Sequence, residues 1–363
     1  MRLDQSDPWT YPSVVGITLE ELQLAARNHG MPLEALRYPV TPVGLHYLLI
    51  HFDVPAAPAD WRLRVGGLVR NGLSLSLADL RARPAVRRAV TMECAGNGRA
   101  RLEPRPLSQP WIAEAVGTGE WGGVPLRDVL EEAGVSDGAV EVVFGALDRG
   151  IDGGVEQFYE RSLPLAEALR ADVLLAYELN GAPLPPQHGF PLRLVVPGWY
   201  GMASVKWLAS IEAVDRPFEG YQQVHAYRFR RDEDEAGEPL SRMRPRALMA
   251  PPGFPDFPER RRFVEPGRVV LEGRAWSGFA PIERVDVSVD SGATWAAAAL
   301  ETAAAPFAWA GWTYEWDAEP GEHELLCRAR DGAGNEQPLE PEWNVGGYVN
   351  NAVQRVPVAV RGR

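Results

Sequence analysis

The segment around Cys94 combines residue types that could bind a metal or attack a substrate. Cys94 follows a strand-like run at residues 89–92 and precedes a loop of small residues that contains Gly96 and Gly98. Seven arginines fall between residues 81 and 105, although the chain as a whole is acidic. Nearby guanidinium groups would lower the pKa of the thiol and favour the thiolate, the form that attacks or binds a metal. The spacing alone also allows a buried, inert cysteine beside an arginine-rich surface, so both interpretations stay open here.

A second group of polar residues lies in loops rich in Gly and Pro, on either side of a short apolar run at residues 192–196. The group contains His188, Arg193, Ser204 and Lys206. Arg193 and Lys206 are suitable partners for a phosphate, one as a planar fork and the other as a point charge. Lys206 is the only lysine among 37 basic residues, which suggests that this position needs a compact ammonium. On residue types alone, two turns with solvated charges explain these loops equally well.

Helices and short strands are mixed in the part of the chain that carries both groups, from about residue 15 to residue 250. Apolar spacing and turn residues predict these elements. Helices are expected at residues 19–27, 33–37, 126–133 and 163–169, and strands at residues 61–65, 73–77, 173–177 and 192–196. The first two strands flank Asn71-Gly72, a dipeptide typical of a hairpin turn.

The last hundred or so residues have a different pattern. A proline-rich stretch begins at residue 251, and short alternating strands with turn signals follow it, as in an immunoglobulin-like β-sandwich. We therefore divide the chain into a first domain at residues 1–250, a linker at residues 251–262 and a sandwich at residues 263–363. We expect Cys327 to be a small core residue, and the tryptophans of the sandwich to be exposed on a packing or dimerisation surface.

The composition excludes several classes of protein. The chain has 363 residues, and its net charge of −12 argues against binding to nucleic acid or to anionic membranes. Two cysteines are too few for a disulfide-stapled fold or a zinc-finger array. No apolar run approaches the ~20 residues of a membrane-spanning helix, and the first seven residues lack the features of an export signal. We therefore expect a cytoplasmic protein.

Several motifs in this sequence resemble those of the sulfite oxidase family of molybdenum enzymes. They are Cys94-Ala95-Gly96-Asn97, residues 172–181, His188-Gly189-Phe190-Pro191-Leu192-Arg193 and Val205-Lys206-Trp207. They occur in the family's order and at similar separations, and the similarity runs from about residue 40 to the C-terminus. The resemblance implies an α+β fold, in which a mixed α/β molybdopterin-binding domain precedes an immunoglobulin-like dimerisation domain.

The resemblance also implies a molybdenum–molybdopterin cofactor. Cys94 matches the cysteine whose sulfur ligates molybdenum, and a soft thiolate suits this metal. The positions that match cofactor-binding residues of the family are Tyr47, His51, Cys94, Asp148, His188, Arg193, Ser204, Val205 and Lys206. Arg99 and Tyr227 match residues that orient the substrate or stabilise developing charge, so we assign them as catalytic. The sequence contains no Cys-x-x-Cys-His motif, and we expect no haem.

The sequence departs from the family where a substrate anion would bind. An arginine expected inside the loop from Tyr47 to His51 is Leu49 here, and one expected from the second domain falls at Ala280 or Pro281. Each lost guanidinium removes charge-assisted hydrogen bonds of about 1.5–3 kcal/mol. We therefore expect oxygen-atom transfer on a small substrate in a more apolar pocket that binds a dianion such as sulfite poorly.

Three hypotheses follow from these observations. The preferred one is a molybdenum-dependent oxidoreductase that works with an external electron-transfer partner and forms a homodimer through its C-terminal domain. The second is a cofactor-binding protein on the same fold with little or no sulfite-oxidising activity. The third is a hydrolase in which Cys94 is the nucleophile and His51 or His188 is the base.

Overall fold

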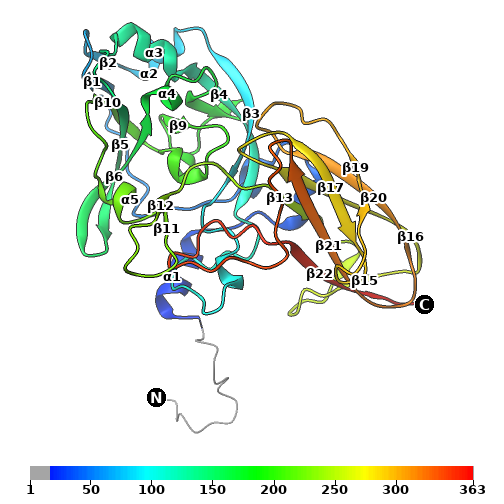
Figure 1. Cartoon of the computed structure of the whole chain (residues 1–363). Helices are drawn as coiled ribbons and strands as arrows, with labels where there is room; N and C mark the ends of the chain where they lie inside the picture. The colour runs from blue at the N-terminus through cyan, green and yellow to red at the C-terminus, as the bar shows by residue number, and fades with distance from the viewer. Residues whose placement is uncertain (1–16, 363) are drawn as a thin grey trace.

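The computed structural model describes residues 17–362, so the predicted lack of an export signal at the start of the chain lies outside the described residues. The first part of the molecule is built on two sheets, shown in cyan to green in Figure 1. The strand order of one sheet is β2 (Leu73–Leu75), β1 (Leu63–Gly67), β10 (Leu208–Val214), β5 (Glu141–Asp152) and β6 (Val155–Pro164). The other sheet contains β3 (Val86–Glu93), β4 (Val116–Pro125), β7 (Leu174–Leu179) and β8 (Ala182–Pro183), with β9 (Arg193–Val195) also paired to β7. Only β1 and β10 run parallel; the other pairs in these two sheets are antiparallel.

Short helices and a small hairpin cover these sheets. The α-helices are α1 (Leu19–Arg27), α2 (Leu77–Arg81), α3 (Leu126–Ala133), α4 (Leu165–Ala168) and α5 (Tyr221–Val224). The 3₁₀ helices are η1 (Leu33–Arg37), η2 (Val43–Leu45), η3 (Arg99–Arg101), η4 (Pro186–His188) and η5 (Gly201–Ala203). The two-stranded hairpin consists of β11 (Arg228–Phe229) and β12 (Glu238–Pro239). None of the helices within residues 17–362 is long and apolar enough to cross a membrane.

Most of the predicted local elements are present. The helices expected at residues 19–27 and 33–37 are α1 and η1, and the Asn71-Gly72 turn joins β1 to β2. The predicted helix at residues 126–133 is α3, whose apolar side chains are buried, and Gly134 ends it with a φ of 69°. The helix expected at residues 163–169 was too long. Leu163 and Pro164 complete β6 opposite β5, which leaves a single turn as α4.

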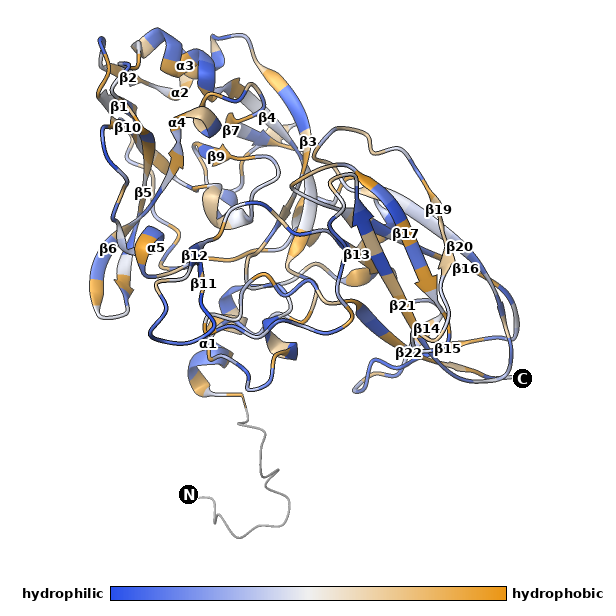
Figure 2. Cartoon of the chain, viewed as in Figure 1, coloured by the Kyte–Doolittle hydropathy of each residue, from blue (hydrophilic) through white to orange (hydrophobic). Residues whose placement is uncertain are grey.

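The second part of the molecule is a sandwich of two sheets, shown in yellow to red in Figure 1. One sheet has the order β13 (Arg246–Met249), β16 (Gly267–Trp276), β20 (Ala310–Ala318) and β19 (Ala299–Leu300). The other has the order β14 (Phe254–Pro255), β15 (Arg262–Val264), β22 (Gln354–Val360), β21 (Gly321–Asp331), β17 (Ile282–Ser288) and β18 (Ala296–Ala297). Figure 2 shows apolar and polar segments alternating along β17 and β21, as expected for strands with one buried face. The fold is therefore the α+β arrangement expected from the sequence, a mixed α/β part followed by a β-rich part.

Four of the six tryptophans after residue 262 are buried and do not form the exposed surface that the sequence suggested, whereas Trp295 is half-buried and Trp343 is 36% exposed. Trp312 and Trp316 lie in the core between the two sheets, with Cys327 as a buried neighbour. Trp276 and Trp309 are also buried, and both belong to the core cluster of the first part of the molecule. Their apolar area stabilises the core and the contact between the two parts, and is not available to a partner.

The two sheets of the sandwich begin before and within the predicted linker. Strand β13 pairs with β16, although it precedes residue 250. The proline-rich segment supplies β14, which pairs with β15. The division at residues 1–250, 251–262 and 263–363 stays a prediction, and these pairings would place its first boundary nearer residue 246.

Candidate functional site

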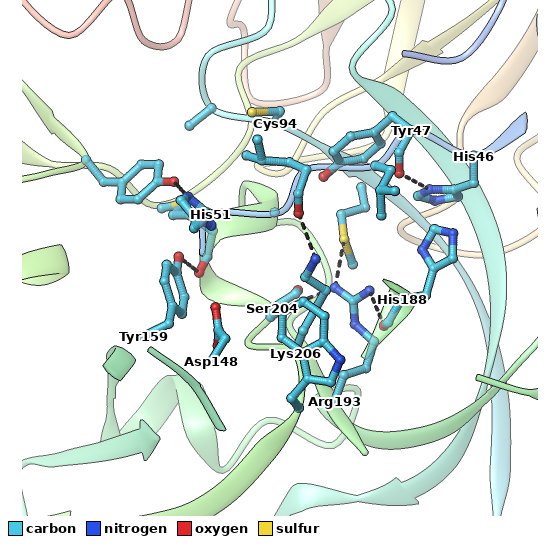
Figure 3. A pocket seen from close by; sticks show the side chains of 18 residues that line it. His46, Tyr47, His51, Cys94, Asp148, Tyr159, His188, Arg193, Ser204 and Lys206 are labelled. Atoms are coloured by element: carbon cyan, nitrogen blue, oxygen red, sulfur yellow. Dashed lines mark hydrogen bonds between the residues drawn. The ribbon is translucent and has the colours of Figure 1, made fainter. Parts of the chain in front are cut away.

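A cavity in the first part of the molecule brings most of the predicted site residues together, and its empty space, including the part open to solvent, is about 630 Å³. Nine of the eleven predicted residues line it: Tyr47, His51, Cys94, Asp148, His188, Arg193, Ser204, Lys206 and Tyr227. In the view of Figure 3, Cys94 lies on one side of this cavity, and Arg193 and Lys206 lie on the opposite side. A soft ligand atom therefore faces a pair of cations across one cavity.

Cys94 is held at the end of β3 by backbone and side-chain hydrogen bonds. Its amide donates to the Ala115 carbonyl at 2.9 Å, and its own carbonyl accepts from the Asn97 amide at 3.0 Å. Asn97 in turn accepts from the Ala115 amide at 3.1 Å through its side chain. The turn after β3 is therefore fixed, and Cys94 is 6% exposed.

The expected lowering of the Cys94 pKa is wrong for the protein alone. Burial raises the pKa of the Cys94 thiol, and the lowering effect of Arg99 does not overcome it. Two other arginines of the cluster, Arg83 and Arg105, form ion pairs with Glu132 and with the buried Glu21. These two arginines are near Cys94 in the sequence, but it is these carboxylates that pair with their charges.

Arg193 and Lys206 form the cationic side of the cavity. The Arg193 guanidinium donates to the carbonyls of His188 and Ser204 at 3.1 and 3.0 Å, and its carbon lies 4.6 Å from the ring centre of Trp121. Lys206 Nζ donates to the Leu49 carbonyl at 2.7 Å and lies 4.3 Å from the ring centre of Trp207. Neither cation forms an ion pair within residues 17–362, so both charges remain available to an anionic ligand.

Burial shifts the pKa values of Lys206 and Asp148 toward neutrality. It lowers the pKa of Lys206 to about 7, with a further lowering by Arg193. It raises the pKa of Asp148 to about 6, and Lys206 opposes this shift. Both groups therefore change charge near neutral pH in the protein alone.

His51 and Tyr227 form a hydrogen-bonded pair at the border of the cavity. His51 Nε2 is bonded to the Tyr227 hydroxyl, and its ring stacks on Tyr159 with 4.8 Å between ring centres. Burial lowers the pKa of His51 to about 3, so the imidazole is neutral at neutral pH. Tyr227 has a φ of 50°, an uncommon backbone conformation for a bulky residue, which fixes the direction of its side chain.

A second cavity of about 1190 Å³ shares Leu49, His51, Cys94 and Tyr227 with the first. We call it the entrance cavity, because it leads to Cys94 and Tyr227. Its lining mixes apolar and aromatic side chains with polar and charged ones. The apolar and aromatic residues include Leu24, Leu49, Ile50, Phe52, Trp111, Ile151, Ala226, Tyr221 and Tyr348, and the polar and charged ones are His51, Arg99, Ser108, Gln109, Asp152, Gln222 and His225. Arg99 is therefore placed in this entrance cavity and not in the first one.

The Arg99 guanidinium already has several partners. It donates to the carbonyls of Gly346 and Gln109 at 3.0 and 3.1 Å, and its carbon lies 5.1 Å from the ring centre of Tyr348. The Tyr348 ring also lies 5.3 Å from the ring of Tyr227. Arg99 consequently has fewer free donors for a substrate than a guanidinium that only faces a cavity.

Val205 lies away from the site, and so do Ala280 and Pro281, where an arginine of the second domain was expected. Val205 is 1% exposed in the apolar core and lines neither cavity. Ala280 and Pro281 line a separate cavity of about 1040 Å³, beside β16 and the loop after β19. The second part of the molecule reaches the site through residues 346–348, so the substitution at Ala280 does not alter the pocket next to Cys94.

The sequence did not indicate some residues that the structure places at the site. His46 lines the first cavity beside His188, with 5.6 Å between ring centres, and burial lowers its pKa to about 4. Tyr159 and Tyr348 come from segments far from Cys94 in the chain. For Tyr348 the one sequence signal was the Gly346-Gly347 pair before it, which allows close approach to Arg99.

No group of three or more His, Cys, Asp and Glu side chains within residues 17–362 could hold a metal ion. No hydrogen bond in the same range joins the Cys94 thiol to His51 or His188, as a cysteine nucleophile and its base would require. The third hypothesis, a hydrolase, therefore has no geometric support.

Comparisons with known proteins agree with this arrangement. The oxidoreductase molybdopterin binding domain matches residues 51–222, and the Mo-co oxidoreductase dimerisation domain matches residues 258–361. Sulfite oxidase from Gallus gallus is 38% identical over 341 residues, which cover 87% of this chain and 72% of that protein. Mitochondrial sulfite oxidase from Homo sapiens is 36% identical over 386 residues, covering 99% and 69%. The crystal structure of the sulfane dehydrogenase SoxCD from Paracoccus pantotrophus superposes with a TM-score of 0.79 at 27% identity, over 100% of this chain and 96% of that chain.

Proposed function

Because the chain belongs to the sulfite oxidase family of molybdopterin-dependent oxidoreductases, we propose that it transfers an oxygen atom to or from a small substrate with a molybdenum–molybdopterin cofactor. The observation that carries this proposal is the cavity of about 630 Å³ in which Cys94 faces Arg193 and Lys206. Cys94 would be the protein's ligand to molybdenum. When bound, the cofactor supplies the two-electron redox chemistry of the reaction.

The residues of the first cavity fit an anionic organic cofactor. Arg193, Lys206 and Ser204 come from β9 and the loop after η5, and two of them are cations without a carboxylate partner within residues 17–362. Burying such cations without a counter-charge costs several kcal/mol, which a phosphate would offset. Tyr47, His51, Asp148 and His188 complete the lining and would hold the pterin.

Arg99 and Tyr227 would orient the substrate in the entrance cavity. The Tyr227 hydroxyl can donate to a substrate oxygen when the neutral His51 ring carries its proton on Nε2 and donates it to the phenol oxygen. Leu49 lies between the two cavities, where the family resemblance implies an arginine. Arg99 is partly committed to backbone carbonyls, so we propose an anion pocket that binds sulfite weakly.

Three further features belong to this proposal. We infer a homodimer that forms through the C-terminal domain, which the match of a dimerisation domain to residues 258–361 supports. The reaction also needs an external electron-transfer partner. The cytoplasmic location expected from the sequence stays a prediction.

The test is metal analysis of the protein produced in a host that makes molybdopterin. We expect about one molybdenum per chain in the wild type and a large loss in Cys94→Ser, with Cys327→Ser as the matched control, because that thiol is buried in the sandwich. A wild type without molybdenum would overturn the proposal. Stoichiometric molybdenum without reduction of a dye by sulfite or other small sulfur compounds would favour the alternative, a cofactor-binding protein with little activity.

A further inference from the structure

Arg161 is a buried guanidinium whose charge has no counter-ion. It lies on β6, is 1% exposed, and donates to the backbone carbonyl of Gln222. Its Nε has no hydrogen-bond partner, and no carboxylate within residues 17–362 forms an ion pair with it. Glu141 acts on it only through space, and burial lowers the pKa of Arg161. Because a guanidinium remains protonated despite this lowering of its pKa, Arg161 keeps its positive charge.

Among the buried arginines of residues 17–362, the paired and the unpaired ones lie in different places. Arg246 and Arg262 have the carboxylates of Glu93 and Glu34 at 3.2 and 3.3 Å. Arg99, Arg161 and Arg193 form no ion pair with a carboxylate in the same range. Arg193 lines the first cavity and Arg99 the second, whereas Arg161 lines neither and contacts Tyr227 and Gln222, which line the second. A buried unpaired charge costs several kcal/mol, so its repeated occurrence around one site indicates that the site's occupants supply the counter-charge.

Arg161 is coupled to the entrance cavity through two residues that line it. Its guanidinium carbon lies 5.6 Å from the ring centre of Tyr227, within the range of a cation–π contact. Its other contact, Gln222, belongs to α5 and lines the same cavity. Tyr159, Tyr227, Tyr348 and Glu141 act on its charge electrostatically. Asp152 accepts from the Gln222 side chain at 3.1 Å and lines the same cavity.

We propose that Arg161 is a positioning residue that holds Tyr227 in place and makes the entrance cavity selective for a negatively charged substrate over a neutral one. This inference rests on the proposed function, because it takes the entrance cavity as the path of the substrate.

The experiment uses the full chain loaded with molybdenum and measures binding of sulfate and of dimethyl sulfoxide by calorimetry. Arg161→Gln removes the charge and keeps a donor for the Gln222 carbonyl, and Arg161→Lys keeps the charge. The matched control is Arg149→Gln, because Arg149 lies at the same 5.6 Å from an aromatic ring, that of Phe158, but is exposed. We expect Arg161→Gln to weaken sulfate binding at least tenfold, and Arg161→Lys and Arg149→Gln to stay within threefold of the wild type. Binding of dimethyl sulfoxide should change less than threefold in every variant.

Several results would overturn the inference. These are equal sulfate affinity in Arg161→Gln and the wild type, no measurable sulfate binding to the wild type, or an equal loss in Arg161→Lys, which would indicate a purely structural role. If Arg161→Gln does not fold, Arg161→Met is measured in its place. If neither neutral variant folds while Arg161→Lys does, this result would also contradict the inference. Metal analysis of the same samples separates the two proposals, since normal molybdenum with unchanged sulfate binding contradicts only this one.

Discussion

At the scale of single residues, Lys206 makes cofactor binding depend on pH. Its pKa of about 7 in the protein alone means that the ammonium is half deprotonated at neutral pH. Because a phosphate binds the charged form, cofactor affinity should fall as pH rises above 7, by up to about tenfold per pH unit. Uptake of molybdopterin by the cofactor-free protein between pH 6 and 9 measures this slope.

The control for this prediction is Lys206→Arg. A guanidinium remains charged throughout this pH range, so the dependence above pH 7 should disappear even if the affinity itself changes. Asp148, with a pKa of about 6, should add a smaller gain in affinity below that pH as its carboxylate is protonated. An unchanged slope in Lys206→Arg would assign the titration to another group.

Leu49 is the residue at which the substrate preference can be tested most directly. Its side chain lies between both cavities, whereas only its backbone carbonyl contacts Lys206, so an arginine there adds a guanidinium without removing that bond. A charge-assisted hydrogen bond contributes about 1.5–3 kcal/mol, so Leu49→Arg should lower the KM for sulfite about tenfold or more. Ala280→Arg should leave KM unchanged, because Ala280 lines a different cavity. Equal effects of the two substitutions would contradict the placement of the anion pocket.

At the scale of elements, the last residue of β3 joins the site to the sandwich. Glu93 is 2% exposed, lies 3.2 Å from Arg246, the first residue of β13, and accepts from the Trp276 indole of β16 at 2.9 Å. It also accepts from Asn97, the residue that fixes the turn after Cys94, at 3.0 Å. One carboxylate therefore connects three strands and the turn that carries the thiol.

Glu93→Ala should lower the free energy of unfolding by about 3–5 kcal/mol, because it leaves the Arg246 guanidinium buried without its carboxylate. Chemical denaturation measures the effect. Glu315→Ala is the matched control, since its ion pair with Arg268 joins two strands of the same sandwich but is more than half exposed, and its loss should cost about 1 kcal/mol or less. Similar losses of unfolding free energy in both variants would mean that the buried Glu93–Arg246 pair contributes no more to stability than the exposed Glu315–Arg268 pair.

The same scale explains which elements the sequence could predict. Helices α1 and α3 and the β1–β2 hairpin depend on caps, apolar spacing and a turn dipeptide, which are local signals. The end of β6 and the strands β13 and β14 depend on partner strands elsewhere in the chain, so local patterns missed them.

The candidate site divides in the same way. Cys94, His188, Arg193 and Lys206 belong to motifs at strand ends, and their chain order carried the family resemblance. Tyr348 and Arg161 carry no motif, and their contacts with Arg99 and Tyr227 cross long stretches of chain. The expectation that Ala280 lies in the anion pocket was wrong for the same reason. The packing of the two parts decides which loop of the second part reaches the cavity, and no local pattern shows this.

At the scale of the whole molecule, the two parts form one functional unit. Buried polar contacts cross between them at Glu93–Arg246, at Arg99–Gly346 and between the Asn350 side chain and the Gly98 carbonyl. All three contacts involve the turn after β3 or residues next to it. A rigid junction here keeps Tyr348 in place in the entrance cavity, so the sandwich contributes to the site as well as to any dimer.

The homodimer is the remaining prediction at this scale. Two aromatic side chains near β14, at the edge of the sandwich, are strongly exposed: Phe257 at 89% and Phe254 at 64%. Large exposed aromatic side chains close together are typical of surfaces that a partner covers. We therefore expect sedimentation to give about twice the chain mass of 39.9 kDa. Phe254→Asp with Phe257→Asp should raise the dimer dissociation constant about tenfold or more, whereas Ile151→Asp, equally exposed on the first part of the molecule at 71%, should leave it unchanged. A monomeric wild type would contradict the dimer, and a dimer that is insensitive to the aromatic substitutions would move its interface to another face of the sandwich.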